Sequence, residues 1–399
     1  MGKQLSITRK IAVVIPKYGL VGGAEGFAAA LTEQLARESA FEIHIFANRW
    51  NKQRLQEGVY FHTIPIIPFP KFLQTISFAI FAQNAIGKTG VDIIHAHDRM
   101  FHPDLYSMHG IPHRIWVKDV RRKRYPSLFD RSTSWVERRM VAGGTCRYFL
   151  AVSRLARDVF LKEYPIPIDQ VPVVHPGIDP TILAKEKNLE DRYIVRRQYG
   201  LPTDVPLVVF VSMNFDIKGL PILLAGLGRM RVIYPDQLFH LLVVGGDKRG
   251  KYELMAAKAG ILDRVIFSGT VSPEKLVNIY AAGDLYAMLS KFDTFGMVVL
   301  EAMAKGLPVV VSSNVGASDL IKENVNGFVI SPPLDADKVA QVIYKALQPE
   351  AKNVMSKAAL ATARMFTWER SARKVAEIYR KIDEIKKKSV PSGHNNERH

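Results

Sequence analysis

Short apolar runs alternate with amphipathic stretches along most of this chain. We expect buried strands at 11–15, 41–46, 91–96, 148–152 and 171–174 in the first half, and at 207–211, 239–244, 265–267, 284–289 and 308–311 in the second. Helical patterns lie between them; Phe27, Leu31 and Leu35, for example, fall on one helical face. Strands that alternate with helices in both halves predict two doubly wound, Rossmann-like α/β domains.

The length and the polar stretches indicate how these domains divide the chain. A chain of 399 residues is too long for a single ordinary core. The stretch at 175–191 is polar and rich in turn residues, which predicts a first domain at 1–185 and a second at 186–368. We expect a helix at about 369–385 that packs back on the first domain, and a disordered tail at 386–399. In paired domains of this kind the ligand lies in the cleft across which they face each other.

Composition excludes several classes of protein. Hydrophobic residues make up 48% of the chain, as in globular proteins, and no apolar run approaches the roughly 18 residues of a membrane span. The stretch 1–10 lacks the apolar core of a signal peptide. The single cysteine, Cys146, excludes an internal disulfide framework and fits a reducing cytoplasm; it suits either a small buried hydrophobe or a reactive thiol.

The chain is strongly basic, and its charge is concentrated. The formal net charge is +17, and the segment 113–147 holds ten Lys or Arg residues against three Asp or Glu residues. A candidate surface patch in this segment consists of Trp116, Arg121, Arg122, Lys123 and Arg124. Two interpretations stay open: an ordinary solvated surface, or an interface for anionic lipid or a phosphorylated glycolipid.

The densest chemical signal follows the predicted strand at 284–289. Asp293 precedes a helix start, Glu301 lies eight positions later, and Gly306 and Pro308 end the helix. The first turn exposes backbone N–H groups and the positive end of the helix dipole, which suit a phosphate. These N–H groups belong to Phe295, Gly296, Met297 and Val298. Ionised carboxylates accept hydrogen bonds from sugar hydroxyls, so the segment predicts a nucleotide-sugar site.

Two other elements suit the diphosphate of such a ligand. Lys218 supplies a cation, and Gly22 with Gly23 permits close backbone approach; the alternatives are an exposed lysine and a generic tight turn. The sequence has no Asp-x-Asp motif and no His, Cys or Asp cluster at metal-ligand spacing. We therefore expect neither a metal ion nor a cofactor.

These motifs together resemble the retaining family 4 glycosyltransferases, whose fold is GT-B. The family's paired-acid motif is matched by Asp293-x7-Glu301, and its other elements by 175–179, Lys218-Gly219, Gly22-Gly23 and His109-Gly110. The resemblance covers nearly the whole chain and implies metal-independent hexosyl transfer of EC 2.4.1 type with retention. Local runs such as 243–253 are similar to the lipopolysaccharide core glucosyltransferases within the family.

The resemblance also implies roles for individual residues. Glu301 would accept hydrogen bonds from the ribose, Asp293 would bind the donor sugar, cap the helix or do both, and Lys218 would bind the diphosphate. His109 would donate a hydrogen bond to the sugar or the β-phosphate, unless it is structural. His97 and Asp98, at the end of the strand at 91–96, suit either acceptor orientation or buried hydrogen bonding.

Two positions depart from the family pattern. Asp293 stands where Glu is usual, so its carboxylate reaches one methylene less far. Met213 stands where the family usually carries an Arg that clamps the diphosphate together with the Lys. Arg99 is a candidate replacement and, with His97 and Asp98, a candidate acceptor-binding residue; an ordinary surface arginine is the alternative.

The activity that this resemblance implies is transfer of a hexose, with glucose from UDP-glucose as our expectation. The acceptor would be a lipopolysaccharide core, another glycolipid or a surface polysaccharide. The enzyme would then lie in the cytoplasm, peripherally on the inner face of the bacterial inner membrane, without a nucleic-acid partner. The alternatives are a degenerate GT-B protein that binds glycan or nucleic acid, and a nucleotide-sugar epimerase.

Overall fold

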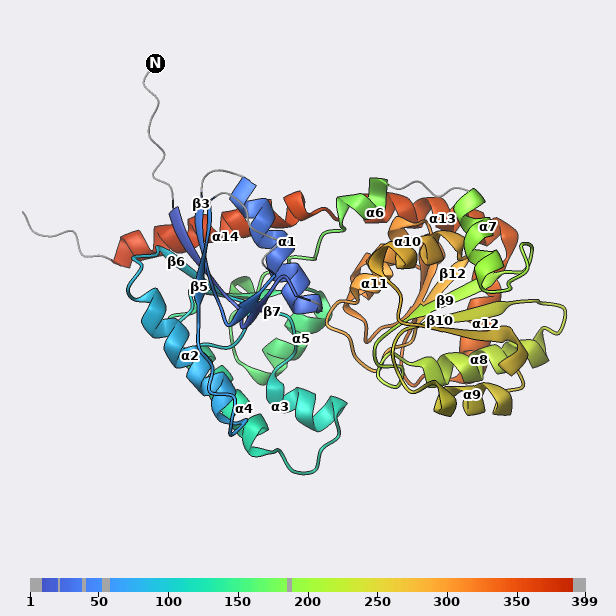
Figure 1. Cartoon of the computed structure of the whole chain (residues 1–399), viewed down its shortest axis with the longest axis horizontal. Coiled ribbons are helices and arrows are strands. Elements are labelled where there is room, and N and C mark those ends of the chain that lie inside the picture. The colour runs from blue at the N-terminus through green and yellow to red at the C-terminus, as the bar shows by residue number, and fades with distance from the viewer. Residues whose placement is uncertain (1–8, 21, 38–40, 52–57, 185–188, 390–399) are drawn as a thin grey trace, which may run out of the picture. The chain divides into compact units, whose positions relative to one another are not determined.

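The computed structural model of the chain describes residues 9–20, 22–37, 41–51, 58–184 and 189–389. These residues divide into two compact units (Figure 1). Unit 1 comprises the described residues within 9–152, 156–175 and 368–389, and unit 2 comprises 153–155 and the described residues within 176–367. Each unit contains one six-stranded sheet in which all neighbouring strands pair in parallel.

The sheet of unit 1 has the strand order β5-β3-β1-β6-β7-β8. Its strands are β1 (Arg9–Val14), β3 (Phe41–Ala47), β5 (Val59–Thr63), β6 (Ile93–Ala96), β7 (Leu105–Met108) and β8 (Tyr148–Ala151). A small ribbon of β2 (Lys17–Tyr18) and β4 (Arg49–Trp50) lies beside it. Because the chain starts in the middle of the sheet and works outward in both directions, this is the Rossmann order.

Helices cover the sheet of unit 1. They are α1 (Gly23–Arg37), α2 (Leu73–Ile86), α3 (His113–Ile115), α4 (Leu128–Ala142), most of α5 (Arg154–Glu163) and α14 (Trp368–Ser389). A π-helical turn, Trp116–Val120, follows α3 directly. The helix α14 packs against α1 and β6, whereas α2 packs against α4 (Figure 1).

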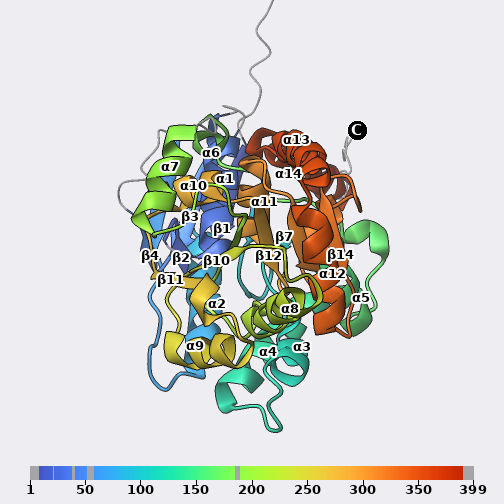
Figure 2. The ribbon, with the colours of Figure 1, turned by 90° about the vertical axis from the view of Figure 1, so that its right-hand side faces the viewer.

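Unit 2 repeats the same architecture with the order β11-β10-β9-β12-β13-β14. The strands are β9 (Leu207–Val211), β10 (His240–Val244), β11 (Val265–Gly269), β12 (Leu285–Met288), β13 (Val309–Ser312) and β14 (Gly327–Ile330). The helices are α6 (Pro180–Ala184), α7 (Leu189–Gln198), α8 (Leu220–Ile233), α9 (Arg249–Lys258), α10 (Pro273–Ala282), α11 (Met297–Ala304), α12 (Ala336–Leu347) and α13 (Pro349–Arg364). Among them, α8 and α12 pack closely together (Figure 2). The predicted pair of Rossmann-like α/β domains is confirmed.

Three details of the prediction are wrong. The stretch 171–174 forms only an isolated bridge between Ala151 and Val173, because it runs beside the end of the sheet for a single residue pair. The strands β5, β7 and β14 went unpredicted. The helix α14 continues to Ser389, so 386–389 is helical rather than part of a tail; Lys386 donates to Asp104 Oδ2 at 2.6 Å, which holds this last turn. The rest of the predicted tail, 390–399, lies outside the described residues.

Candidate functional site

The carboxyl ends of β9 and β12 bring together two of the predicted donor-site residues in unit 2. Lys218 follows β9 and Asp293 follows β12, and the Lys218 ammonium forms an ion pair with the Asp293 carboxylate. The two loops are tied by backbone contacts, since the N–H of Lys291 and the hydroxyl of Ser290 both donate to the carbonyl of Ile217, at 2.7 and 2.9 Å. A fixed cation therefore lies beside a fixed carboxylate.

Glycines make this close approach of the loops possible. Gly219 has a φ of 84°, and a Cβ atom there would lie 1.9 Å from the carbonyl oxygen of Leu289. Gly296, with a φ of 89°, precedes α11, and its hypothetical Cβ would meet the side chains of Met288 and Val315 at 2.9 and 3.0 Å. Only glycine fits both conditions, so the backbone at each position is adapted to the loop geometry.

The amino end of α11 lies directly after Asp293. The N–H of Phe295 donates to Asp293 Oδ1 at 3.2 Å, so this carboxylate closes a local turn as well as pairing with Lys218. No side chain caps α11 at Gly296, and Met297 and Val298 are partly buried residues. The described geometry therefore combines a helix dipole with the Lys218 ammonium on one side of unit 2, an arrangement that favours an anion.

Glu301, one turn further along α11, has a partner that the sequence did not reveal. The hydroxyl of Tyr280 on α10 donates to Glu301 Oε2 at 3.1 Å, and Tyr280 itself is fully buried. Burial raises the pKa of Glu301, and the hydrogen bond from Tyr280 opposes this rise. The contact orients one carboxylate oxygen and leaves the other able to accept hydrogen bonds. An aromatic residue on the apolar side of a helix carries no sequence signal for such a role.

The predicted residues of unit 1 gather around a cavity of about 380 Å³, which we call the histidine cavity. Its lining includes His97, Asp98 and Arg99 after β6, and His109 and Gly110 after β7. The start of α1 contributes Ala24 and Glu25, beside the Gly22-Gly23 loop. Gly22 has a φ of 154°, a backbone conformation that favours glycine. Strand ends and a helix start thus meet here, as the Rossmann order requires.

A chain of buried rings supports His109. Its Nε2 lies 2.9 Å from Nδ1 of His97, and the two rings are stacked with centroids 5.2 Å apart. His95 packs on His97 at 4.2 Å and contacts Tyr379 of α14 and Ser107, both at 2.7 Å. Burial lowers the pKa of His95 and of His109 to about 3 and also lowers that of His97. The three imidazoles are therefore neutral at neutral pH.

The hydrogen-bond network assigns the tautomers of the pair. A neutral imidazole has one donor and one acceptor nitrogen. Nε2 of His97 is buried and has no partner among the described residues, and a buried orphan acceptor is better tolerated than a buried orphan N–H. The proton of His97 therefore resides on Nδ1 and is donated to Nε2 of His109. His109 consequently carries its own proton on Nδ1 and acts as a donor there.

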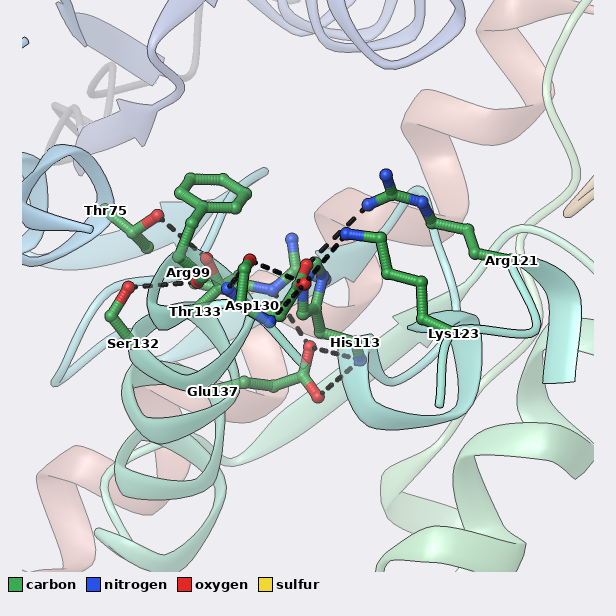
Figure 3. A network of polar contacts seen from close by, with 11 residues as sticks. Thr75, Arg99, His113, Arg121, Lys123, Asp130, Ser132, Thr133 and Glu137 are labelled. Atoms are coloured by element: carbon green, nitrogen blue, oxygen red, sulfur yellow. Dashed lines mark hydrogen bonds and ion pairs between the residues drawn. The ribbon is translucent and has the colours of Figure 1, made fainter. Parts of the chain in front are cut away.

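The Arg99 guanidinium forms ion pairs with two carboxylates of unit 1. Its Nε donates to Glu137 at 2.9 Å, and its Nη1 lies 3.3 Å from Asp98. Figure 3 shows this guanidinium within a network that continues through Glu137 to His113 and Asp130. Since two carboxylates already neutralise the charge, the predicted use of Arg99 as a diphosphate clamp gains no support from its contacts.

The basic segment 113–147 is more structured than its composition indicates. Asp130 is buried and accepts ion pairs from Lys123 at 3.2 Å and from Arg121 at 3.7 Å (Figure 3). Burial opposes the charge of Asp130, but hydrogen bonds from Ser127, Lys123 and His113 outweigh it and lower its pKa. Of the predicted surface patch, Arg122 and Arg124 are exposed, Arg124 lies over the Tyr125 ring, and Trp116 is half-buried.

The described residues also bear on metal binding, membrane crossing and the single thiol. No group of three or more His, Cys, Asp or Glu side chains is arranged there to hold a metal ion. Within the same residues, no helix combines the length and the apolar character that are needed to cross a bilayer. Cys146 is buried, as one of the two interpretations expected, and burial raises its pKa.

Known protein families match both halves of the chain. The family "Glycosyltransferase Family 4" matches residues 21–182, and "Glycosyl transferases group 1" matches residues 191–362. A curated relative from Methanocaldococcus jannaschii, described as an uncharacterized glycosyltransferase, is 25% identical over 93% of this chain and 98% of its own length.

Solved structures share the fold. WaaG, a glycosyltransferase involved in lipopolysaccharide biosynthesis, superposes with a TM-score of 0.76 at 22% identity, over 92% of this chain and 99% of that one. Anabaena HepE in complex with UDP-glucose gives a TM-score of 0.70 at 19% identity, over 93% and 99%. At these identities the likeness shows the fold alone.

Proposed function

This chain belongs to the family 4 glycosyltransferases, and from that membership we propose that it transfers glucose from UDP-glucose to a saccharide acceptor on a lipid or surface polysaccharide. Membership carries the coarser statement: the protein is a retaining, metal-independent glycosyltransferase of GT-B fold that uses a nucleotide-sugar donor. The presence of UDP-glucose in the HepE complex supports the choice of donor.

One observation in particular supports the donor site: the ion pair between Lys218 and Asp293 beside the uncapped start of α11. We assign the diphosphate to Lys218 and to the N–H groups of 295–298, because the leaving group gains negative charge in the transition state. When the donor enters, Lys218 exchanges its carboxylate partner for the phosphate. Asp293 is then released toward the hydroxyls of the sugar.

We propose the remaining roles from the family membership, and the described contacts are compatible with them. Glu301, oriented by Tyr280, accepts hydrogen bonds from the ribose. His109 donates a hydrogen bond through its Nδ1–H to the donor sugar or the β-phosphate. Because the imidazole is neutral, it keeps this Nδ1 proton at physiological pH. The Gly22-Gly23 loop admits the phosphates closely, and His97 and Asp98 line the cavity in which the acceptor hydroxyl arrives. The leaving phosphate takes the acceptor proton.

We further propose that the enzyme works in the cytoplasm at an anionic membrane surface. Tyr125 and Leu128 are 74% and 64% exposed beside the basic residues Arg122 and Arg124, a combination that suits a lipid headgroup region. Vesicle sedimentation tests this: binding should require anionic lipid and weaken with added salt. Equal binding to neutral vesicles would contradict it.

A panel of nucleotide sugars tests the donor assignment. The purified chain is heated with UDP-glucose, UDP-galactose, ADP-glucose or GDP-mannose, and release of the nucleotide is measured in parallel. UDP-glucose should raise the melting temperature most, since a ligand that binds only the native state stabilises it, and should give turnover. Stabilisation by a different donor would reassign the substrate, and no stabilisation by any donor would contradict the proposed donor site.

A further inference from the structure

The basic segment encloses a second cavity in unit 1, of about 600 Å³, which we call the basic cavity. It lies between the π-helical turn at 116–120 and the exposed face of α4. Its positively charged lining residues are Arg114, Lys118, Lys123, Arg124, Arg131 and Arg138, and the carboxylate among the described lining residues is that of Asp130. The volume falls within the range of small-molecule sites, roughly 300–1,000 Å³, and far exceeds that of a single ion.

Charge in this cavity is not balanced by the protein. Asp130 is already satisfied by Lys123, Arg121, His113 and the capping Ser127 (Figure 3). Arg114 pairs with Glu163 at 2.8 Å. Lys118, Arg131 and Arg138, by contrast, have no ion-pair partner within the described part of the chain. These three exposed cations line one cavity without a counter-charge, an arrangement that favours an anion with several oxygen acceptors.

The spacing on α4 places these groups together. Arg131, Trp135 and Arg138 lie at positions i, i+4 and i+7 and so share one helical face. The Trp135 ring is held by the edge of Phe101 and by the guanidinium of Arg139, both at 5.7 Å, yet it is still 41% exposed. A fixed, partly exposed indole offers an apolar platform, and the C–H face of a sugar ring can cover it.

The basic cavity also shares a polar wall with the histidine cavity. Arg99, which lines the histidine cavity, is bound by Glu137; Glu137 in turn accepts from the N–H of His113 at 3.0 Å. His113 Nε2 lies 3.1 Å from Asp130, which lines the basic cavity (Figure 3). A network of hydrogen bonds through Glu137 and His113 therefore connects the linings of the two cavities.

We propose that the basic cavity binds a phosphate-substituted saccharide of the acceptor. Lys118, Arg131 and Arg138 hold the phosphate, and Trp135 supports the sugar ring. This inference rests on the proposed function, because it specifies the acceptor of that reaction. The phosphate-bearing sugar belongs either to a lipid-linked acceptor or to a soluble one, and the experiment below includes both sources.

The test measures binding of glucose 6-phosphate, glucose and inorganic phosphate to the full chain by calorimetry. Glucose 6-phosphate should bind more tightly than glucose, and Arg131→Ala/Arg138→Ala should weaken it about tenfold or more, since each lost charge-assisted hydrogen bond has about that effect. Arg373→Ala/Lys374→Ala on the exposed face of α14 removes the same charge and should leave the affinity unchanged. Equal losses of glucose 6-phosphate affinity in both variants would show that only the net charge of the protein matters, and would overturn the inference.

A second variant separates the sugar from the phosphate. Trp135→Ala should weaken glucose 6-phosphate several-fold and leave inorganic phosphate unaffected, whereas Trp135→Phe should restore the sugar affinity. Vesicles with a phosphorylated glycolipid, compared with phosphatidylglycerol vesicles, identify a lipid-linked source. Binding to phosphatidylglycerol vesicles without any binding of glucose 6-phosphate or the glycolipid would overturn the inference in favour of a simple membrane contact.

Donor turnover distinguishes this inference from the proposed function. Hydrolysis of UDP-glucose without acceptor should be the same in the wild type and in Arg131→Ala/Arg138→Ala. Turnover that persists while glucose 6-phosphate binds no better than glucose overturns the basic-cavity assignment alone. Specific glucose 6-phosphate binding by a protein that turns over no nucleotide sugar would support the cavity and contradict the proposed donor.

Discussion

The two candidate sites use opposite electrostatic means. In unit 2, Lys218 and Asp293 are charged, 26% and 15% exposed, and neutralise each other across two loops. In unit 1, His97 and His109 are kept neutral by burial and by their mutual hydrogen bond. The charged pair can exchange partners when an anionic donor enters, whereas the neutral pair offers a fixed donor that does not change with pH in the physiological range. In the function that we propose, the charged pair binds the diphosphate, and the neutral His109 donates a hydrogen bond to the donor sugar or the β-phosphate.

Among the variants considered, removal of the Lys218 ammonium should have the largest effect on activity. Lys218→Ala should lower the turnover of UDP-glucose by about 10²–10³-fold, the usual effect of removing one group that stabilises developing negative charge. Lys251→Ala is the matched control, because Lys251 also pairs with an aspartate, Asp216 at 2.6 Å, but is half exposed. The Lys251→Ala variant should keep nearly wild-type turnover, because an exposed ion pair contributes little. Turnover within about threefold of wild type in Lys218→Ala as well would contradict the assignment of Lys218 to the donor site.

Glu301 lies between the two extremes, as a carboxylate whose pKa is raised by burial. Because the pKa of Glu301 is higher in the folded chain than in the unfolded chain, where it is near 4.5, Glu301 favours folding at pH values below 4.5. This contribution to the free energy of unfolding is lost as the pH rises through the pKa of Glu301 in the folded chain. Tyr280→Phe removes the hydrogen bond that opposes this shift. The variant should therefore lose about 1–3 kcal/mol of unfolding free energy at pH 8 and less at pH 4.

Urea denaturation at both pH values measures this difference. Tyr286→Phe is the control, because Tyr286 is equally buried but donates to the sulfur of Met288 at 3.6 Å. Its loss of stability should be similar at the two pH values. A Tyr280→Phe variant whose loss of stability does not depend on pH would mean that Glu301 does not change its protonation state between pH 4 and pH 8.

The neutral half of the comparison can be tested through the tautomer of His109. His97→Leu removes the donor to His109 Nε2 and should lower turnover about tenfold, the equivalent of one neutral hydrogen bond. His97→Asn keeps an N–H near the position of Nδ1 and should retain most of the activity. Nitrogen-15 NMR of the imidazoles should report the Nδ1–H form of His109 in the wild type. An Nε2–H form there would reverse the assigned direction of the hydrogen bond.

The smallest effect is expected at Met213, which stands where the family usually carries an arginine. Met213 follows β9, and its side chain is 71% exposed. Met213→Arg places a cation where the family usually has one and should lower the KM for the donor by about two- to fivefold, the scale of an exposed ion pair. Met213→Gln controls for polarity without charge. An unchanged KM in the arginine variant would indicate that Lys218 and α11 alone hold the diphosphate.

Sequence patterns singled out more of the residues in the charged cluster of unit 2 than in the neutral cluster of unit 1. Lys218, Asp293 and Glu301 carry charges at loop and helix positions where few other roles are available, so their types and spacing are informative. Tyr280 and Tyr379 lie on buried faces of amphipathic helices, where an aromatic residue is indistinguishable from ordinary core. The ion pair of Lys218 with Asp293 and the commitment of Arg99 to Glu137 depend on tertiary packing, which local patterns do not encode.

The same limit applies to the fold. Residues 207–211 form a strand with the predicted bounds, because five buried apolar residues in sequence fit a strand covered on both faces. At 171–174 the chain is also apolar, but strand formation depends on a partner edge that the sequence does not specify. The strand β7 contains Tyr106 and Ser107, and its short, mixed composition resembles a loop.

The helix α14 gives the chain an unusual order of assembly. Tyr379 completes the ring network behind His97, and Val375 and Ile382 are buried in unit 1, although they are synthesised after the whole of unit 2. On the ribosome, unit 2 has all of its strands available before unit 1 receives this last helix. The first half to be translated is therefore the last to mature, and a premature stop before Trp368 would yield a protein with an intact second unit and an unfinished first one.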